Sequence, residues 1–588
     1  MPIAFSSAGM ARLGILLLAL SLAGPAAAQQ VGPEWRTLSE PWQGLNREVR
    51  ELAAQRHVVG FTVAVVVQGR LVWQHSHGPQ QVGGQNTFDT NSPILLGQIS
   101  ALYLAAVALR LEHHGLLDLD ARVTDRLPTL RIGRVPSVHR APTVREILLG
   151  RSGLSMGRLE GRYCRIGECR PLAERDEDLY ALSEPMVLGG LQSAAAMDVL
   201  VRVLETASGL DIETLIAREV AEPLGLETPE FGASSPLHRK GRRIADLLTR
   251  ERHTLGAVTT LDQLRRLSQA LLAADDGWLP RASRFRMFSA QPLGDSAMPW
   301  ARAAFLFRVS DLPEAGPEVA RIASFYPYSD VRMHIVAEHG IAVLAASNFD
   351  PEDASLGKVM AAALHAALSE AGVDSTPPGD DDAPLPETIP LPGELESDEF
   401  AARYATVFGL FETATDGGQY KVTSAGWNFT ASPRDDGWYR LRLRVLRIPI
   451  GLSFLNRVAV RPVRLGERRL LLMSTPGTTV ILGSAWDTPA DAREITRWQG
   501  EYRLVNPDPL AEQADISRVE VVLADGVPQI RVPLPGLLTP TLEIPLEREQ
   551  GDLYRVAGFG PGLGERFQFR IDDGTAELEY SGYRLRRQ

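Results

Sequence analysis

Hydrophobic and polar positions alternate between strand-like and helix-like periods along the first part of the chain. Residues 60–78 hold two β-branched apolar runs on either side of a glycine-containing turn, which predicts a strand-turn-strand hairpin. Within 194–205, apolar residues recur at spacings of three and four, which predicts a helix with one buried face. Residues 332–348 predict a second hairpin, and 357–372 a closing helix. Strands at both ends with helices between them favour one α+β domain whose terminal strands share a sheet.

The pattern changes in the last third of the chain. Residues 373–397 are rich in proline and acidic residues and have no apolar period, which is typical of an extended linker. Beyond them, short alternating runs are broken by Gly, Asp and Pro, which predicts two small all-β barrel or sandwich domains. We therefore expect a first domain at 29–372 and β domains at 398–490 and 491–588.

The N-terminal residues 1–28 have the composition of a secretory signal. Arg12 precedes the apolar run LGILLLALSLAG, and the small residues of PAAAQQ offer a cleavage site after Ala28. This run is shorter than the ~20 residues needed to span a membrane, so we expect no transmembrane segment once the signal is removed. The chain is therefore predicted to be periplasmic or secreted.

Composition narrows the range of partners and cofactors. With 588 residues and a formal charge of -11, the chain is long enough for several domains, and nucleic-acid binding is not expected. Its two cysteines, Cys164 and Cys169, could pair as a disulfide in an oxidising compartment. They have no neighbouring histidines to complete a zinc site, and we predict neither a metal nor a cofactor.

Four segments of the first domain carry a family resemblance. In chain order they are EHHGLLDLDARVTDRLP (112–128), PTVREILLGRSGLS (142–155), VLETASGLDIETLIAREVAEPLGLE (203–227) and LGAVTTLDQLRRLSQALL (255–272). Together they resemble the serine β-lactamase and penicillin-binding-protein superfamily, in its esterase and class C-like branch, over residues 45–368. The resemblance implies a β-lactamase/DD-peptidase-like domain, with an antiparallel sheet flanked by helices and a helical subdomain.

The chemistry of that superfamily depends on three motifs. A serine at the N-terminus of a buried helix attacks an acyl carbon, and a lysine one helical turn later lies beside it as the base. A Tyr-x-Asn motif relays the proton, and a Lys/His-x-Gly strand flanks the pocket. Backbone amides stabilise the oxyanion, and one of them belongs to the serine itself.

The first motif is missing from this chain. Aligned through GLLDLD, the serine position falls on Gln98 and the lysine position on Ala101. If the alignment is shifted by two residues, Ser100 takes the serine position, but Tyr103 then takes the lysine position. No lysine occurs anywhere in residues 1–239, and arginine cannot act as the base because its pKa stays above about 12.

The other two motifs are missing as well. The Tyr-x-Asn position falls on Gln192-Ser193-Ala194, so Gln192 replaces the tyrosine and Ala194 the asparagine. The stretch RIASFYPYS at 321–329, where the third motif is expected, contains no Lys/His-x-Gly. A literal S-x-x-K occurs only at Ser355–Lys358, too late in the chain for the other motifs to follow it. We interpret Ser355 as a helix N-cap.

Three functional hypotheses remain open. The first is a pseudoenzyme, a catalytically inactive binding or regulatory module of the cell envelope, whose partner would be a cell-wall peptide or glycan or another envelope protein. Its former pocket would be lined by Gln98, Ser100, Gln192 and Ser193. Alternatively, these side chains only fill a relict cleft.

The second hypothesis is an active serine hydrolase with a rearranged site. Its candidate nucleophiles are Ser100, Ser152 and Ser193, and its candidate bases are His113, His114 and His139. In the third hypothesis the β domains bind glycan, lipid or a partner protein, and the first domain is a scaffold. Residues 441–471, which interleave arginines with apolar residues, would form that surface, although a solvated strand face gives the same pattern.

Overall fold

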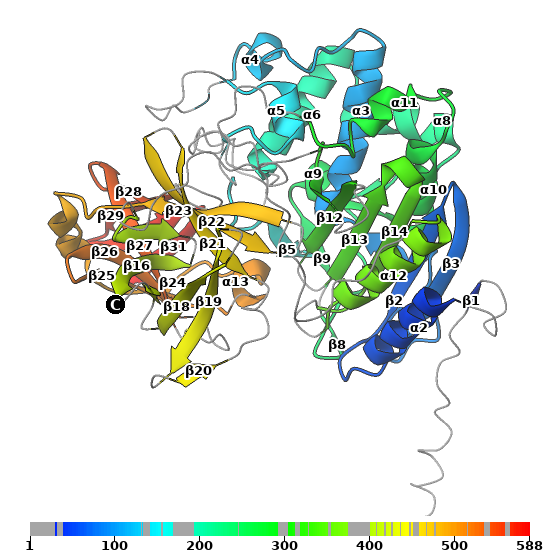
Figure 1. Cartoon of the computed structure of the whole chain (residues 1–588). Coiled ribbons are helices and arrows are strands. Elements are labelled where there is room, and N and C mark those ends of the chain that lie inside the picture. The colour runs from blue at the N-terminus through cyan, green and yellow to red at the C-terminus, as the bar shows by residue number, and fades with distance from the viewer. Residues whose placement is uncertain are drawn as a thin grey trace, which may run out of the picture.

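The structure is a computed structural model of the whole chain (Figure 1). It describes residues 30–31, 39–130, 132, 141–154, 157–167, 193–244, 246–291, 304–311, 318–326, 329–350, 354–373, 400–406, 408–416, 419–424, 427–434, 437–445, 448–450, 458–465, 467–475, 478–513, 515–533, 541–558 and 565–588. The predicted signal at 1–28 and almost all of the predicted linker at 373–397 lie outside these residues. In the part of the chain so described, no helix is both long and apolar enough to cross a membrane.

The first domain is built on a seven-stranded antiparallel sheet in the order β1-β3-β2-β14-β13-β12-β11. Its strands are β1 Gln30–Val31, β2 Phe61–Val67, β3 Arg70–His77, β11 Arg308–Asp311, β12 Glu318–Tyr326, β13 Ser329–Val336 and β14 Ile341–Ser347. Both predicted hairpins are confirmed, as β2–β3 and β13–β14. Strand β2 pairs with β14, so strands from the two ends of the domain share one sheet, as predicted.

Both faces of this sheet are covered. Every residue of β2 and β14 is buried, because one face of these central strands packs on α2 (Glu40–Ala53) and α12 (Gly357–Glu370) and the other on the helical part. Val63 and Val65 point to the first layer, whereas Ala64 and Val66 point to the second. Figure 1 shows α2 and α12 side by side in front of the sheet.

The helical part surrounds α3 (Ala101–His113), which is buried along nearly its whole length. Its other elements are η2 Gly97–Ser100, α4 Val123–Arg126, α5 Val144–Leu148, α6 Ala194–Ser208, α7 Ile212–Ile216, η4 Ala217–Ala221, α8 Glu222–Leu224, α9 Arg252–Leu255, α10 Leu261–Leu272 and α11 Arg281–Phe285, while η5 Ala337–His339 connects β13 to β14. The short strands are β4 Pro93–Leu95, β5 Tyr163–Arg165, β6 Glu230–Phe231, β7 His238–Arg239, β8 Arg242–Arg243, β9 Leu247–Thr249 and β10 Ala257–Thr260. Because α3 is apolar all round, it forms the centre of this layer.

The C-terminal part forms two closed eight-stranded barrels, which decides between the predicted barrel and sandwich. In the first barrel, β18 pairs with β19 to close the ring, and β20 extends β19 at the side. Its strands are β15 Arg403–Thr406, β16 Gly409–Asp416, β17 Gln419–Ser424, β18 Trp427–Pro433, β19 Tyr439–Val445, β20 Ile448–Ile450, β21 Ala459–Leu465, β22 Arg468–Thr475 and β23 Thr478–Ala485. Closure leaves the barrel without open edges.

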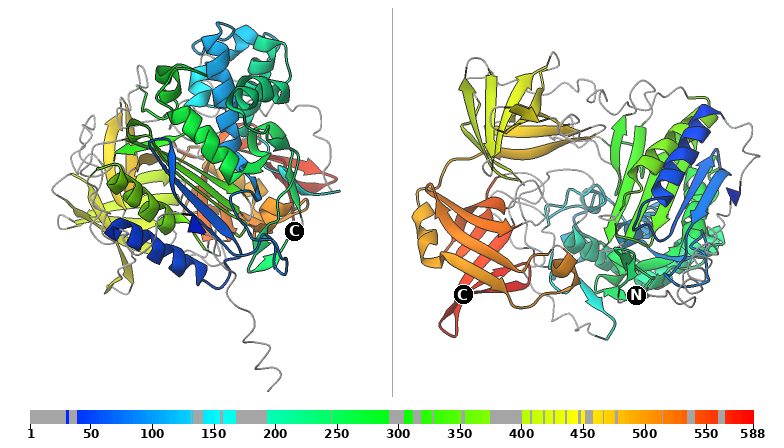
Figure 2. Two further views of the ribbon diagram at one scale, coloured as in Figure 1. Left: turned by 90° about the vertical axis from the view of Figure 1, so that its right-hand side faces the viewer. Right: turned by 90° about the horizontal axis from the view of Figure 1, so that it is seen from below.

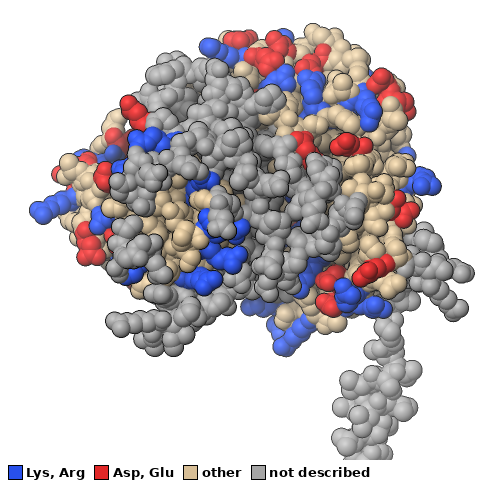
Figure 3. All heavy atoms as spheres, in the orientation of Figure 1, with Lys and Arg blue, Asp and Glu red and all other residues tan. Residues whose placement is uncertain are grey.

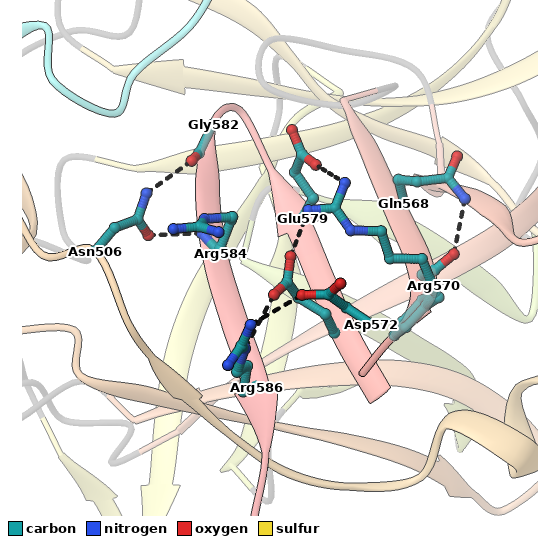
Figure 4. Close-up of polar contacts among 10 residues, drawn as sticks. Asn506, Gln568, Arg570, Asp572, Glu579, Gly582, Arg584 and Arg586 are labelled. Atoms are coloured by element: carbon teal, nitrogen blue, oxygen red, sulfur yellow. Dashed lines mark hydrogen bonds and ion pairs between the residues drawn. The ribbon is translucent and has the colours of Figure 1, made fainter. Parts of the chain in front are cut away.

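The second barrel runs from β24 to β31. Its elements are η8 Ala492–Trp498, β24 Gly500–Leu504, α13 Pro509–Gln513, β25 Arg518–Ala524, β26 Val527–Pro533, β27 Thr541–Gln550, β28 Leu553–Val556, β29 Arg566–Asp572, β30 Thr575–Tyr580 and β31 Tyr583–Arg587. Opposite charges stand next to each other on its outer wall, where Arg570 and Arg586 both pair with the fully buried carboxylate of Glu577. Figure 4 shows Arg586 also reaching Asp572, at 2.9 Å.

The outer face of the first barrel packs against the first domain. Val463, Leu470 and Leu472 belong to the same hydrophobic cluster as the core around α3, and each has no exposed surface. Strand β11 lies against β23 at this contact. Of the stretch 441–471, for which a solvated strand face was one interpretation, Val463 and Leu470 are not solvated, because the first domain covers that side of the strands.

The second barrel is attached through the segment 157–167 of the first domain. The Gly161 N–H donates to a carboxylate oxygen of Asp508 at 2.7 Å, and the hydroxyl of Ser581 donates to the Gly157 carbonyl at 2.7 Å. The other oxygen of Asp508 accepts from the Tyr583 hydroxyl at 2.8 Å. Figure 2 shows the two barrels lying side by side next to the first domain.

Candidate functional site

The N-terminal end of α3 carries the residue that stands where the superfamily has its nucleophile. The 3-10 turn η2 leads directly into α3, so the partly buried Gln98 lies at the start of the buried helix, as the alignment predicts. One turn later Ala101 is fully buried. This position therefore offers a carboxamide and a methyl group in place of a hydroxyl and an amine.

Strand β12 lies beside η2 and supplies a partner for the main chain of Gln98. The Gln98 N–H donates to the hydroxyl oxygen of Ser324 at 3.1 Å, and Ser324 is 1% exposed. An amide at the first turn of a helix has no intrahelical acceptor, so this hydroxyl satisfies it. Sequence reasoning had singled out 321–329 as lacking a Lys/His-x-Gly motif, but it had not identified Ser324 as a contact of Gln98.

Ser100 and Tyr103 hold strand β10 against the same helix. The Ser100 hydroxyl oxygen accepts from the Ala257 N–H at 3.1 Å, and Ser100 has no exposed surface. The Tyr103 hydroxyl hydrogen-bonds Thr259, and burial raises the pKa of Tyr103 to about 12. Ser100 is thus a structural hydroxyl inside the core rather than a residue lining an open pocket, which corrects our expectation.

The second motif position lies at the start of α6. The Ser193 hydroxyl oxygen accepts from the Ala196 N–H at 3.1 Å, so Ser193 is the N-cap of this helix. Ala194 is the first residue of α6. Gln192 lies outside the described residues.

The other residues of the rearranged-site hypothesis have local roles. The Ser152 hydroxyl oxygen accepts from the Leu154 N–H at 3.2 Å, a turn contact. His113 and His114 lie at the C-terminal end of the 13-residue helix α3, roughly 20 Å from Gln98 by helix rise. His114 is 3.6 Å from the Glu219 carboxylate. His139 lies outside the described residues.

The literal S-x-x-K lies at the surface. Ser355 and Lys358 are both exposed, and the Ser355 hydroxyl oxygen accepts from the Gly357 N–H and from Arg332, both at 3.1 Å. The N-cap of α12 is Leu356, so the predicted cap was wrong by one residue, although Ser355 still satisfies an amide of the first turn.

A partly buried ion pair connects the surroundings of Gln98 to the segment that carries the second barrel. Helix α9 lies against η2, and Glu251 directly precedes it. Arg162 Nε lies 3.0 Å from Glu251 Oε1. Burial raises the pKa of the Glu251 carboxyl, and the charge of Arg162 acts in the opposite direction.

The structure describes one of the two cysteines and shows how the possible metal ligands lie within the described residues. Cys164, in β5, is disulfide-bonded, while Cys169 lies outside the described residues, so the pairing of the two stays a prediction. Within the described ranges, no three His, Cys, Asp or Glu side chains are grouped so that they could hold a metal ion.

Comparison with known proteins gives one family match. The family model described as Beta-lactamase matches residues 45–368. Esterase EstB of Burkholderia gladioli is 28% identical over 193 residues, which is 31% of this chain and 49% of that protein. The chain thus matches about half the length of this curated relative.

Several solved structures match the chain at low sequence identity, including the following two. The structure of SurE with D-Leu covers 75% of this chain and 99% of that chain, at 18% identity and a TM-score of 0.50. The octameric penicillin-binding protein homologue from Pyrococcus abyssi covers 93% of this chain and 100% of that chain, at 15% identity and a TM-score of 0.45.

Proposed function

The chain belongs to the β-lactamase family, and we propose that it is a catalytically inactive member that acts as a binding or regulatory module in the cell envelope. The observation that carries this proposal is Gln98 at the N-terminus of α3, with its N–H donated to Ser324 at 3.1 Å. Both the side chain and the main chain of this residue are thereby different from what acyl transfer requires.

The first requirement is a nucleophile with a base beside it. A carboxamide has no ionisable proton to lose, and Ala101 supplies no amine. Losing nucleophile and base together costs about six orders of magnitude in triad enzymes. Residues 1–239 contain no lysine that could replace the base from a neighbouring element of this stretch.

The second requirement is an amide that is available to a developing oxyanion. In the superfamily the N–H of the nucleophile serves this purpose, and in this chain the N–H of Gln98 is bonded to a hydroxyl inside the protein. An acyl substrate would have to displace Ser324 before the amide could stabilise it. Such a displacement would leave the buried Ser324 hydroxyl without this contact.

The partly buried carboxamide of Gln98 is suited to binding rather than to bond cleavage. It offers two donors and one acceptor at the end of a buried helix, which matches the amide and hydroxyl groups of a cell-wall peptide or glycan. An envelope role rests on the N-terminal residues 1–28, whose apolar run has the form of an export signal.

The rearranged-hydrolase alternative has no observation in its favour among the described residues. The hydroxyl oxygens of Ser100, Ser152 and Ser193 each accept a hydrogen bond from a backbone amide. His113 and His114 lie at the far end of α3.

The proposal is tested by exposing the full chain to a fluorescent penicillin and to a fluorophosphonate probe, with intact-mass readout. A penicillin-binding protein with a complete S-x-x-K motif serves as the positive control. We expect no adduct, together with saturable and reversible binding of a muropeptide that weakens in Gln98→Ala. A stoichiometric adduct on any serine would overturn the inactive assignment.

A further inference from the structure

A cavity of about 760 Å³ lies between the first domain and the second barrel. The first domain contributes a strongly basic wall, made of Arg56 and His57 from the α2–β2 connection and of Arg239, Lys240 and Arg242 from the β7–β8 hairpin. Figure 3 shows basic side chains at the lower edge of the molecule, in the region of β8. These residues are separate from those around Gln98.

The hairpin that carries three of these side chains is firmly held. Lys240 and Gly241 have φ angles of 50° and 69°, which is the two-residue turn that suits a tight hairpin. His238 is fully buried, and its Nδ1 lies 2.9 Å from the carbonyl oxygen of Asn348. The His238 carbonyl accepts from the Asp350 N–H at 2.9 Å. The hairpin part of the basic wall is therefore held in place by contacts within the first domain.

The opposite wall belongs to the second barrel and is acidic. It consists of Glu512 at the end of α13 and of Asp515. Arg165 forms an ion pair with Glu512, so this carboxylate is already partly neutralised. Helix α13 is held by Asp508, which caps it through the Ala511 N–H at 2.9 Å.

Arg56, Arg239, Lys240 and Arg242 line this cavity together with Glu512 and Asp515. Arg239 Nε lies 3.4 Å from the buried carboxylate of Asp350, and Glu512 pairs with Arg165, so the positive excess rests mainly on Arg56 and Arg242 against Asp515. The whole chain has a formal charge of -11, so its composition does not lead one to expect a net positive cavity. A concave surface lined by one sign of charge concentrates the field and attracts ligands of the other sign.

We propose that this cavity binds a small ligand with two or more oxyanion groups, carboxylate or phosphate. Guanidinium groups bind such oxyanions through paired hydrogen bonds, and Arg56 and Arg242 come from separate elements, so each could take its own group. The cavity volume is in the range of small-molecule sites, which favours a small ligand over a macromolecule. A ligand held here touches both domains and strengthens the attachment of the second barrel.

The test is calorimetric titration of the full chain with citrate and, separately, with inorganic pyrophosphate at low ionic strength. The double variant Arg56→Gln/Arg242→Gln removes two exposed charges of the basic wall. Arg70→Gln is the matched control, because Arg70 is equally exposed and lies at the β2–β3 hairpin, away from the cavity.

We expect saturable binding with about one ligand per chain, roughly tenfold weaker in the double variant and unchanged within about twofold in Arg70→Gln. Asp515→Asn should strengthen binding, because it removes a repulsive carboxylate. Tighter binding of citrate assigns a polycarboxylate ligand, and tighter binding of pyrophosphate assigns a ligand with two phosphate groups. Absence of saturable binding of both, or an equal loss in the double variant and in Arg70→Gln, would overturn the proposal.

Discussion

The main-chain N–H of Gln98 donates a 3.1 Å hydrogen bond to the hydroxyl of Ser324, 226 residues further along the chain. This contact joins the first turn before α3 to strand β12, on the side of the sheet that faces the helical part. The hydrogen bond holds the main chain of Gln98, which occupies the position of the nucleophile in the superfamily.

Restoring the first motif should not restore acylation. We expect the double variant Gln98→Ser/Ala101→Lys to form no adduct with penicillin or fluorophosphonate, because the Tyr-x-Asn and Lys/His-x-Gly motifs remain absent. A lysine at the fully buried position 101 also carries a desolvation cost. Gln98→Ser alone is measured in parallel, since it keeps the core unchanged. An adduct in either variant would show that the surroundings of Gln98 still supply catalytic groups.

Ser324→Ala should destabilise the first domain by about 1 kcal/mol, because it removes the acceptor of the N–H of the partly buried Gln98. Ser268→Ala is the control. Its fully buried hydroxyl donates to the Leu264 carbonyl at 2.7 Å within α10, and this carbonyl keeps its helical partner. Because this substitution leaves no polar group unsatisfied, chemical denaturation should give a change of about 0.5 kcal/mol or less for the control. Equal effects of both substitutions would contradict the role of Ser324.

Asp508→Ala should loosen the second barrel from the first domain. The substitution removes acceptors for the Gly161 N–H, the Ala511 N–H and the Tyr583 hydroxyl, which lie 2.7 to 2.9 Å away. We expect a loss of at least about 2 kcal/mol and new limited-proteolysis cleavage within 157–167.

Glu501→Gln is the matched control for this variant. Glu501 and its partner Arg518 are more than half exposed on the same barrel, so the ion pair contributes little. Its proteolysis pattern should equal that of the wild type. Protection of 157–167 in Asp508→Ala would show that the segment is held by other contacts.

Acid should destabilise the first domain through His75. This side chain is 5% exposed, packs near Phe61 and Trp73, and has a pKa lowered to about 4 from 6.5, chiefly by burial. The folded state therefore binds a proton less readily than the unfolded state, so the stability that His75 contributes is present above pH 6.5 and is lost as the pH falls towards 4. The difference corresponds to about 3 kcal/mol.

Urea denaturation of wild type and His75→Phe at pH 7 and pH 4.5 measures this effect. The variant keeps an aromatic ring but cannot bind a proton, so its stability should fall less with acid. His113→Gln, at an exposed position, should follow the wild type. Parallel pH dependences of wild type and His75→Phe would exclude His75 as the source.

Local sequence patterns predicted the helices and strands and the position of Gln98 at the start of α3. They did not predict which distant residues contact each other. The β2–β3 and β13–β14 hairpins and the buried start of α3 depend on neighbouring residues, whose periods are visible in sequence. The contact of Gln98 with Ser324 and that of Gly161 with Asp508, 347 residues apart, depend on the arrangement of whole elements. The same holds for the basic cavity, whose walls come from three separate segments.

The covering of the barrel's outer wall has one signal in the sequence. Leu470, Leu471 and Leu472 are consecutive, and a strand with apolar residues on both faces is covered on both faces. Leu471 points into the first barrel, whereas Leu470 and Leu472 point to the first domain. The arginines interleaved in 441–471 are, in contrast, typical of a solvated strand face.

The burial of that outer barrel wall changes what counts as a folding unit. A proline-rich stretch such as 373–397 usually marks a boundary at which two domains can be expressed separately. In this chain the domains before and after it share one hydrophobic cluster. A fragment beginning near residue 398 would present Val463, Leu470 and Leu472 to water and would be prone to aggregate. The first domain and the first barrel should therefore unfold together, as one cooperative body built around this shared cluster.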